Sequence, residues 1–537
     1  MNLKILKILK SFNLIEEKKY DEKQQIELVK TSTIFNSKWY LSQNPDVKLK
    51  KIGAAKHYVK YGWKEGRNPS MEFNTNEYIK KHPEILQNNI NPIVHYLYNN
   101  KNNANKEKIT QERYNLIKNS SFWNEKWYLE NNPDVKRAKI NPINHYLKYG
   151  SGNHRNPSPK FNDKLYSTLY PKIKDRCALE YFEQHKKHID KFDVLLISSV
   201  PQNDGVYIWR IKFLEELLQK NGITCKIEII PEISDTFFEK IHACKAVIFS
   251  RPVCRDPHLS IIKMIKDNNK KLIIDTDDLL FPEYAFCSGG YKSGYTTFSS
   301  TKYNMNMHSI CFNFADYCSC STELIKKTIE NNLNKSCKVY KNAISDKYLL
   351  KNPKKNYSSK ELKILYASGS STHDYDFSNI FLPILNFLLK HQDVKLTILG
   401  SSGVGSFFNK ITDRIEIINK VDFNCMLDVF EKHDLLLVPL DDNDFNNAKS
   451  NIKYIEAGAR GTPVLARNCK EFSQVIKDRK NGFLYTPENI EAQLEYIYKN
   501  KNKLNKIGEN ARKDILKNHT TSTDNADFIN FIRNIIC

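Results

Sequence analysis

The hydrophobic pattern of the chain changes near residue 191. Before that point, apolar and aromatic residues recur at helical spacing in short segments that end at Asn-Pro and Gly turns. After it, short apolar runs alternate with amphipathic stretches, as in βαβ units that build a mostly parallel, doubly wound sheet. The pattern predicts an α/β protein with two tandem Rossmann-like domains, preceded by a mostly α-helical repeat module.

Two series of strands are expected, separated by a polar break at 351–361. Two such domains are expected to form a ligand cleft where the carboxyl ends of their strands face each other. The first series of predicted strands is 192–200, 225–230, 246–250, 271–280, 317–321 and 338–343, and the second is 363–370, 394–402, 415–421, 433–440, 462–467 and 482–487.

An internal repeat occupies the first third of the chain. WYLSQNPDV (39–47) recurs as WYLENNPDV (127–135), and HYVKYGWKEGRNPS (57–70) recurs as HYLKYGSGNHRNPS (145–158), both at an offset of 88 residues. With two weaker copies this makes about four units of roughly 40 residues, a period typical of stacked helical units. We interpret the recurring His57, His95 and His145 as packed, hydrogen-bonded residues rather than ligands, and 99–108 as a linker.

The predicted organisation has five parts. They are a basic amphipathic segment (1–30), the helical repeat module (31–190), an N-terminal Rossmann-like domain (191–350), a C-terminal Rossmann-like domain (361–520) and a C-terminal helix (521–537).

The composition of the chain limits the classes of partner that are expected. The net charge of +22 favours anionic partners such as phosphorylated small molecules or acidic lipids. Nucleic-acid binding is set aside because the excess is mostly Lys in a chain rich in Asn and Ile. The 12 cysteines include no C-x-x-C pair, which predicts reduced thiols in a cytosolic protein and no zinc site.

The N-terminus carries a short amphipathic pattern. No apolar run approaches the length of about 18 residues that spans a bilayer. Leu3, Leu6 and Leu9 lie opposite Lys4 and Lys7, so this segment suits either an anionic membrane surface or an ordinary domain edge. We therefore expect a cytoplasmic protein, with peripheral contact at the inner face of the cell membrane as one option.

The stretch KSNIKYIEAGARGTPVLA (449–466) carries the strongest chemical signal. A helix is expected to open at Lys449 or Ser450, with Ser450 as its cap and free N–H groups that suit an anion. Lys449, Lys453 and Glu456 at i, i+4 and i+7 would share one face, where the lysines suit a pyrophosphate and the carboxylate suits a ribose diol. The alternative is a solvated ion-pair face.

The same stretch resembles the donor-binding helix of GT-B glycosyltransferases, in particular the retaining family (glycosyl transferases group 1) that includes bacterial surface-polysaccharide enzymes. On this resemblance Glu456 is the ribose-binding Glu of the E-x7-E motif, and the first Glu of that motif falls on Ala448. The N-terminal repeats resemble modules attached to such enzymes. The resemblance continues through ILYASGSSTHDYDF (364–377), LTILGSSG (396–403), DLLLVPLDDNDFNNA (434–448) and VIKDRKNGFLYTP (475–487), where Lys480 replaces a family Gly.

Further site residues follow from the ends of other predicted strands. Gly369, Ser370 and His373 stand where the family has its pyrophosphate-gripping pair; Gly369 would let a phosphate approach the backbone, and His373 would donate to it or cap the next helix.

In the first domain, Asp277 and Asp278 would orient an acceptor hydroxyl or act as a base, or would simply cap the turn. Gly205 and Arg210 form a phosphate-compatible pair.

The resemblance implies transfer of a hexosyl or deoxyhexosyl group from a nucleotide-diphosphate sugar to a saccharide or lipid-linked glycan. No metal or other cofactor is expected, because lysines and a helix terminus can neutralise the leaving diphosphate. The alternative is a non-catalytic carbohydrate- or nucleotide-binding scaffold derived from a transferase, since Ala448 breaks the family motif.

Overall fold

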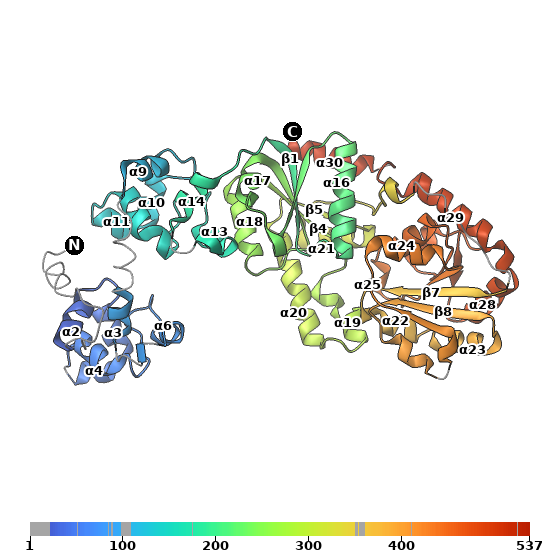
Figure 1. Ribbon diagram of the computed structural model, residues 1–537, viewed down its shortest axis with the longest axis horizontal. Helices are drawn as coiled ribbons and strands as arrows, with labels where there is room; N and C mark the ends of the chain where they lie inside the picture. Colours follow the sequence, from blue (N-terminus) through green and yellow to red (C-terminus); the bar gives the residue numbers. More distant parts are fainter. Residues whose placement is uncertain are drawn as a thin grey trace. The chain divides into compact units, whose positions relative to one another are not determined.

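The computed structural model (Figure 1) describes most of the chain. The predicted N-terminal amphipathic helix and the linker 99–108 lie outside the described residues. Two compact units are present, one comprising residues up to Lys118 with Ile143–Gly152, the other Asn119–Pro142 with Asn153–Cys537. The described residues are 22–50, 52–83, 85–86, 90–97, 109–173, 176–349, 353, 360–409, 411–523 and 525–537.

Short helices form the repeat module. Asn36 caps α3 and Asn124 caps the corresponding α10, each by accepting a hydrogen bond from a Trp amide three residues on. The helices of the first strong copy and its successor are α2 (Glu22–Thr31), α3 (Ser37–Gln43), α4 (Pro45–Leu49), α5 (Ala54–His57) and α6 (Thr75–Lys81). Those that follow are α9 (Gln111–Lys118), α10 (Glu125–Asn131), α11 (Pro133–Arg137), α12 (Pro142–His145), α13 (Asp163–Leu169) and α14 (Ala178–His185).

The repeated Asn-Pro-Asp and Arg-Asn-Pro motifs make the same contacts in both strong copies. Arg67 donates to Asn44 at 2.9 Å and to Asp46 at 2.8 Å. Arg155 makes the equivalent two contacts in the second copy, at 3.1 and 2.8 Å. The buried His57 ring lies 3.0 Å from the Tyr40 hydroxyl, in keeping with a packed, hydrogen-bonded role. These signature residues therefore tie helices and turns together within a unit.

Two six-stranded sheets follow, and every strand pair in them is parallel. The predicted fold class is thereby confirmed. The first sheet has the order β2-β1-β3-β4-β5-β6 and the second β12-β11-β10-β7-β8-β9. The strands of the first are β1 (Phe192–Ser198), β2 (Cys225–Ile229), β3 (Cys244–Ser250), β4 (Lys271–Thr276), β5 (Tyr317–Cys320) and β6 (Cys337–Val339). Those of the second are β7 (Leu362–Ser368), β8 (Val394–Gly400), β9 (Ile415–Ile418), β10 (Leu435–Val438), β11 (Val464–Arg467) and β12 (Phe483–Tyr485).

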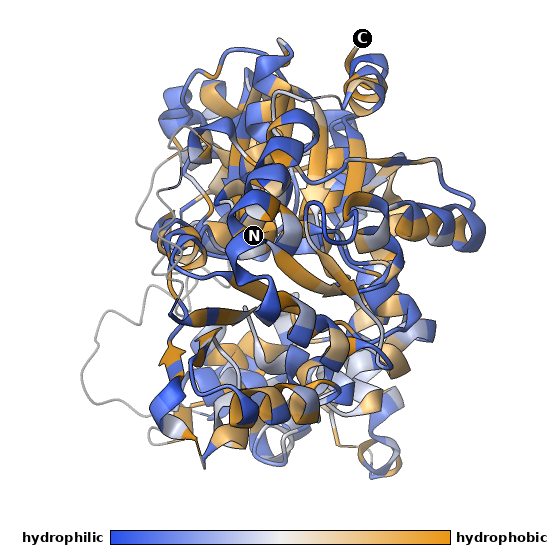
Figure 2. Ribbon diagram, turned by 90° about the vertical axis from the view of Figure 1, so that its right-hand side faces the viewer, coloured by the Kyte–Doolittle hydropathy of each residue, from blue (hydrophilic) through white to orange (hydrophobic). Residues whose placement is uncertain are grey.

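Helices cover both sheets because the strands are apolar on both faces (Figure 2). Around the first sheet lie α15 (Gly205–Tyr207), a π-helical turn (Ile208–Lys212), α16 (Phe213–Lys220), α17 (Phe237–Ala243), α18 (His258–Asp267), α19 (Gly289–Lys292), α20 (Phe298–Ser309) and α21 (Glu323–Leu333). Around the second lie α22 (Asp374–Ser378), α23 (Phe381–Lys390), α24 (Phe423–Glu431), α25 (Asp444–Asn447), α26 (Ile452–Ala459), α27 (Lys470–Val475), α28 (Ile490–Lys499) and α29 (Leu504–Asn518).

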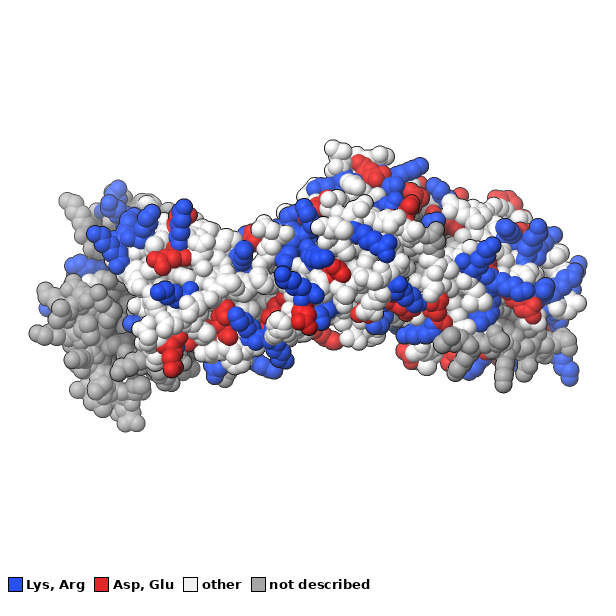
Figure 3. Space-filling model, turned by 90° about the horizontal axis from the view of Figure 1, so that it is seen from above, with Lys and Arg blue, Asp and Glu red and all other residues white. Residues whose placement is uncertain are grey.

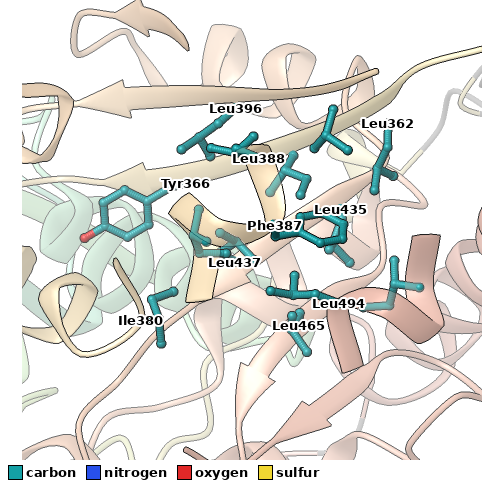
Figure 4. Close-up of a cluster of buried hydrophobic side chains, with 14 of the residues drawn as sticks. Leu362, Tyr366, Ile380, Phe387, Leu388, Leu396, Leu435, Leu437, Leu465 and Leu494 are labelled. Carbon is teal, nitrogen blue, oxygen red and sulfur yellow. The ribbon is translucent and has the colours of Figure 1, made fainter. Parts of the chain in front are cut away.

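One core cluster of the second domain lies between its sheet and helices α23 and α28, and another lies between the sheet and helices α24, α26 and α29. Leu388 of α23 and Leu494 of α28 pack in one cluster with Leu396, Leu435 and Leu437 of the strands (Figure 4). Complete burial of a leucine side chain stabilises a fold by about 1.5–3 kcal/mol, so this cluster holds the strand ends in fixed positions.

The chain passes between the two domains twice. Ile344, after β6, donates its amide to the carbonyl of His519 at 2.8 Å and accepts from the amide of Thr521 at 2.9 Å. The last helix, α30 (Ala526–Ile536), then packs Phe528 and Ile532 into the core of the first sheet. The predicted C-terminal helix is thus confirmed, and it packs on the first domain. Among the described residues, no helix combines the length and apolar character that a membrane span requires.

Candidate functional site

The order of each sheet identifies where a ligand is expected. The strand order reverses between β1 and β3 in the first sheet and between β7 and β10 in the second. In open parallel sheets, ligands bind outside the carboxyl ends of the strands at this switch point. Gly205 follows β1, Gly369 follows β7, and the 449–456 stretch follows β10, so the topology places these predicted site residues at the switch points.

Loops at the carboxyl ends of the two sheets contact each other directly. The Lys449 ammonium of the second domain lies 3.6 Å from Oδ1 of Asp278 in the first. Asn342, after β6, donates to the Ser450 hydroxyl at 2.7 Å. The predicted donor-side and acceptor-side residues are therefore brought together at one place.

Asp278 is the better stabilised carboxylate of the acidic turn. Arg251, which follows β3, donates to its Oδ2 at 2.9 Å, and Lys449 approaches Oδ1. Burial by itself raises the pKa of Asp278, but the positive charges of Lys449 and Arg251 and the hydrogen bond from Arg251 outweigh it and lower this pKa to about 2. A carboxylate held in this way is a weak base.

Asp277 has the opposite environment. Its Oδ1 is buried and accepts no hydrogen bond from any described residue, and the nearest cationic atom is Nε of Arg251 at 3.5 Å. Burial, which outweighs the attraction of Arg251, raises the pKa of Asp277. The two neighbouring carboxyl groups thus have separated proton affinities, and Asp277 is the stronger base.

Arg210 does not occupy an open anion site. Its side chain is completely buried and donates to Asp275 twice, from Nε at 3.0 Å and from Nη2 at 2.6 Å. Its Nη1 donates to the carbonyl of Tyr340 and to Asn342, at 2.8 and 2.9 Å. The prediction that Arg210 binds a phosphate is corrected, because the guanidinium has no exposed surface; it instead supports Asn342, which contacts Ser450.

Gly205 lies exposed at the start of the three-residue helix α15. No atom stands within 4 Å of the position that a Cβ on Gly205 would take. Asp204 accepts a hydrogen bond from the amide of Val206 at 2.8 Å and so caps this turn. Gly205 therefore leaves open backbone beside the β1 switch point, without Arg210 as a partner.

The loop after β7 holds His373 by a relay of buried polar groups. Nδ1 of His373 lies 2.9 Å from Oδ2 of Asp376. The other oxygen of Asp376 accepts from the amide of Asp441 at 3.0 Å and from Asn446 at 2.9 Å. This arrangement commits Nδ1, leaves Nε2 of the partly exposed ring for another contact, and links the loop after β7 to the loop after β10.

Gly369 and Ser370 occupy the start of the same loop. Gly369 is exposed, and a Cβ there would meet no atom within 4 Å. The Ser370 hydroxyl lies 2.7 Å from that of Thr372. Both residues are accessible next to His373, as a phosphate-binding loop requires.

Helix α26 begins later than predicted. Its first residue is Ile452, and its N-cap Asn451 makes no side-chain cap hydrogen bond. Ser450 therefore does not cap the helix, because its hydroxyl is engaged by Asn342. Lys449 precedes the helix and extends to Asp278, so only Lys453 and Glu456 share the predicted face.

Lys453 and Glu456 form a close pair on that face. Nζ of Lys453 lies 2.8 Å from Oε2 of Glu456, whose side chain is only 5% exposed against 31% for the lysine. The interaction fixes one carboxylate oxygen and presents the ammonium group at the surface. A polar, partly covered acceptor of this kind suits hydroxyl groups.

Ala448 fills the position of the missing family Glu. The residue is fully buried, and its carbonyl accepts from the Thr322 hydroxyl of the first domain at 2.9 Å. A contact between the domains is thus made at the position where the resemblance places the first Glu of the motif.

Sequence reasoning missed three residues of this region: Arg251, Asn342 and Asp376. Arg251 directly follows the predicted strand 246–250, so its place at the carboxyl edge was a usable signal. Asn342 and Asp376 act through tertiary contacts that carry no local pattern. Within the described ranges, no three His, Cys, Asp or Glu side chains are placed to hold a metal ion together.

Solved structures with a similar arrangement have low sequence identity to this chain. HepE of Anabaena in complex with UDP and glucose matches with 13% identity and a TM-score of 0.46, over 64% of this chain and 99% of that one. A glycosyltransferase of Rickettsia africae matches with 15% identity and a TM-score of 0.44, over 65% and 99%. Sucrose-phosphate synthase of Thermosynechococcus elongatus matches with 12% identity and a TM-score of 0.42, over 61% and 94%.

No curated protein matches the chain by sequence. A family model, however, matches the part of the sequence that contains β7 to β12 and the predicted donor residues. Residues 351–514 match the model of the family described as Glycosyl transferases group 1.

Proposed function

We propose that this chain transfers a sugar from a nucleotide-diphosphate sugar to a saccharide or lipid-linked glycan. The nucleotide would bind to the C-terminal domain and the acceptor to the first Rossmann-like domain. The observation that carries the proposal is the contact of Asp278, next to Asp277, with Lys449 at the joined carboxyl ends of the two sheets, the second of which lies within residues 351–514, which match the glycosyltransferase family model.

The donor side is supported by the exposed groups around α26 and the loop after β7. Lys453 and the exposed backbone of Gly369 and Ser370 would contact the diphosphate, with Nε2 of His373 as a further donor. Glu456 would accept hydrogen bonds from the ribose diol through the oxygen that Lys453 leaves open. Lys449 and Lys453 would stabilise the negative charge that develops on the leaving diphosphate.

The acceptor side assigns different roles to the two carboxyl groups. Asp277, with its raised pKa and a side chain that is 14% exposed, would take the proton of the acceptor hydroxyl as the hydroxyl oxygen bonds to the anomeric carbon. The bond from that carbon to the diphosphate oxygen would break in the same reaction. Asp278, already neutralised by Arg251 and Lys449, would hold those cations in place.

Finer aspects of the proposal rest on the resemblance and on composition. We propose a hexosyl or deoxyhexosyl donor, a role in cell-surface polysaccharide synthesis, and no need for a metal ion. The cytoplasmic face of the membrane would be the place of action. On the face drawn in Figure 3, basic side chains are interleaved with acidic ones, which favours small anions over a nucleic-acid backbone as partners.

The test is nucleotide release from UDP-, GDP- and dTDP-sugars, measured with and without acceptor glycans. Acceptor-dependent release from one donor supports transfer. Asp277→Asn should abolish it while leaving nucleotide affinity within about twofold, because Asp277 is assigned to the acceptor proton. Turnover that survives in Asp277→Asn would refute the assignment of the base.

Ala448 favours a second candidate, a carbohydrate- or nucleotide-binding scaffold. Its burial against Thr322 places an apolar residue where the family motif has a carboxylate. Tight nucleotide binding without turnover of any donor would identify this function.

A further inference from the structure

A short segment of the first domain grips the loop that carries His373. We call residues 288–296, which include α19, the clasp. Ser293 donates its hydroxyl proton to the carbonyl of Thr372 at 3.0 Å, and the same oxygen accepts from the amide of Tyr375 at 3.1 Å. The clasp therefore bonds to the chain on both sides of His373.

A second contact of the clasp continues into the neighbouring loop. Tyr295 donates its hydroxyl to Oδ2 of Asp374 at 3.2 Å. Asp374 in turn accepts from the hydroxyl of Ser402 at 2.7 Å and from the amide of Gly403 at 2.9 Å. The loops after β7 and β8 are thus joined through one carboxylate that the first domain contacts.

Close packing completes the contact. A Cβ on Gly289 would stand 2.3 Å from the carbonyl oxygen of Thr372, far inside any real contact distance. Nζ of Lys292 lies 3.5 Å from Oδ2 of Asp441 and 4.9 Å from the centre of the Tyr375 ring. Only glycine at position 289 permits this approach.

We infer that the clasp is a positioning element: Gly289 and Ser293 hold the 369–374 loop of the other domain in the conformation that binds the nucleotide diphosphate. The inference rests on the proposed function for the identity of the ligand. None of the clasp residues is assigned a contact with the substrate. Donor affinity would then depend on docking of the first domain, so that a nucleotide sugar is held firmly only when the acceptor-side groups are in place.

The chain offers a matched pair of variants. Gly289→Ala adds a methyl group that collides with the Thr372 carbonyl, whereas Gly290→Ala on the same helix adds one with ordinary contacts, 3.6 Å to Thr296 and 3.7 Å to Thr372. Both changes favour helix formation equally. Ser293→Ala removes two hydrogen bonds, and Ser293→Thr retains the hydroxyl.

The first measurement is hydrogen exchange of the free protein. Gly289→Ala and Ser293→Ala should accelerate exchange in peptides covering 369–376, where Tyr375 donates to Ser293, and Gly290→Ala should not. The second is affinity for UDP, GDP and dTDP by calorimetry. For the nucleotide that binds, the Kd should rise about three- to tenfold in Ser293→Ala and by at least about tenfold in Gly289→Ala. Ser293→Thr and Gly290→Ala should stay within twofold.

Kinetics separate positioning from a general structural effect. The KM for the donor should rise in Gly289→Ala while the KM for the acceptor stays constant. Unchanged or tighter nucleotide binding in Gly289→Ala, despite faster exchange at 369–376, would overturn the inference, as would unchanged exchange. If the wild-type protein binds none of the three nucleotides, the proposed function is overturned instead. The comparison of hydrogen exchange between Gly289→Ala and Gly290→Ala then decides by itself whether the clasp holds the loop.

Discussion

The buried ion pair between Arg210 and Asp275 should be the most expensive polar interaction to break in the first domain. Both side chains are fully buried. Asp275 accepts two hydrogen bonds from Arg210 and a third from the Ser319 hydroxyl, at 2.7 Å. Asp275→Asn keeps the shape of the side chain but leaves the guanidinium buried without a counter-charge. Removing one partner of a buried pair costs about 3–5 kcal/mol, so the free energy of opening of the first sheet should fall by that amount.

A matched control is the exposed pair of Lys263 and Asp267 on α18. Its Nζ–Oδ2 distance is 2.6 Å and the lysine is 65% exposed, so Asp267→Asn removes a carboxylate from a pair worth about 0.3–0.5 kcal/mol. Because the chain has several domains, a single unfolding transition is not expected, and native-state hydrogen exchange of peptides from β4 and β5 is the appropriate assay. At about 1.4 kcal/mol per tenfold, Asp275→Asn should accelerate exchange at least about 100-fold and Asp267→Asn less than about threefold. Similar exchange in the two variants would refute the reasoning.

Other predictions concern the site and the repeats. Glu456→Gln should weaken nucleotide binding about 10- to 100-fold in calorimetry, as expected for a charged hydrogen-bond acceptor, and unchanged affinity would contradict the assignment of the donor helix. Asp277→Asn should raise the melting temperature relative to wild type between pH 5 and 8, and this difference should shrink as the pH falls through about 3.9. The reason is that the raised pKa of Asp277 causes native stability to be lost as the pH rises from the unfolded pKa toward the folded one. Asp278→Asn should lower the melting temperature by the same amount at every pH from 5 to 8. The stability due to Asp278 is present above the unfolded pKa of about 3.9 and is lost only as the pH falls toward 2. A difference that shrinks between pH 8 and 5 would contradict this prediction. Arg155→Ala should destabilise its repeat unit by about 0.5–1.5 kcal/mol in thermal denaturation, since Asn132 and the half-exposed Asp134 lose their shared donor; unchanged stability would contradict a structural role.

The strands were predictable because each is buried on both faces and bounded by polar turns. All twelve predicted segments contain or overlap a strand of the two sheets. In the first sheet, β4 ends at Thr276, so the acidic residues 277 and 278, which the predicted strand 271–280 included, lie beyond the sheet. Parallel topology then brings strand ends together regardless of the details of the sequence.

The errors in the site prediction arose from contacts between distant segments. Arg210 stands in a helical stretch with an exposed glycine nearby, and nothing local reveals that Asp275, 65 residues later, lies against it. Serine is a residue type that often caps helices, but the hydroxyl of Ser450 accepts a hydrogen bond from Asn342 of the other domain. The pKa shifts likewise depend on tertiary surroundings: burial raises the pKa of Asp277, whereas Lys449 and Arg251 lower that of Asp278.

The double passage of the chain between the domains has a mechanical consequence. A domain connected by one segment of chain can rotate about several axes. A domain connected by two adjacent segments is restricted mainly to rotation about the line that joins them. The mutual hydrogen bonds of Ile344 with His519 and Thr521 fix that line, and α30 anchors its far end in the first sheet. A change in the angle between the two sheets would therefore be a rotation about this line, and the clasp and the His373 loop would separate and rejoin in one register.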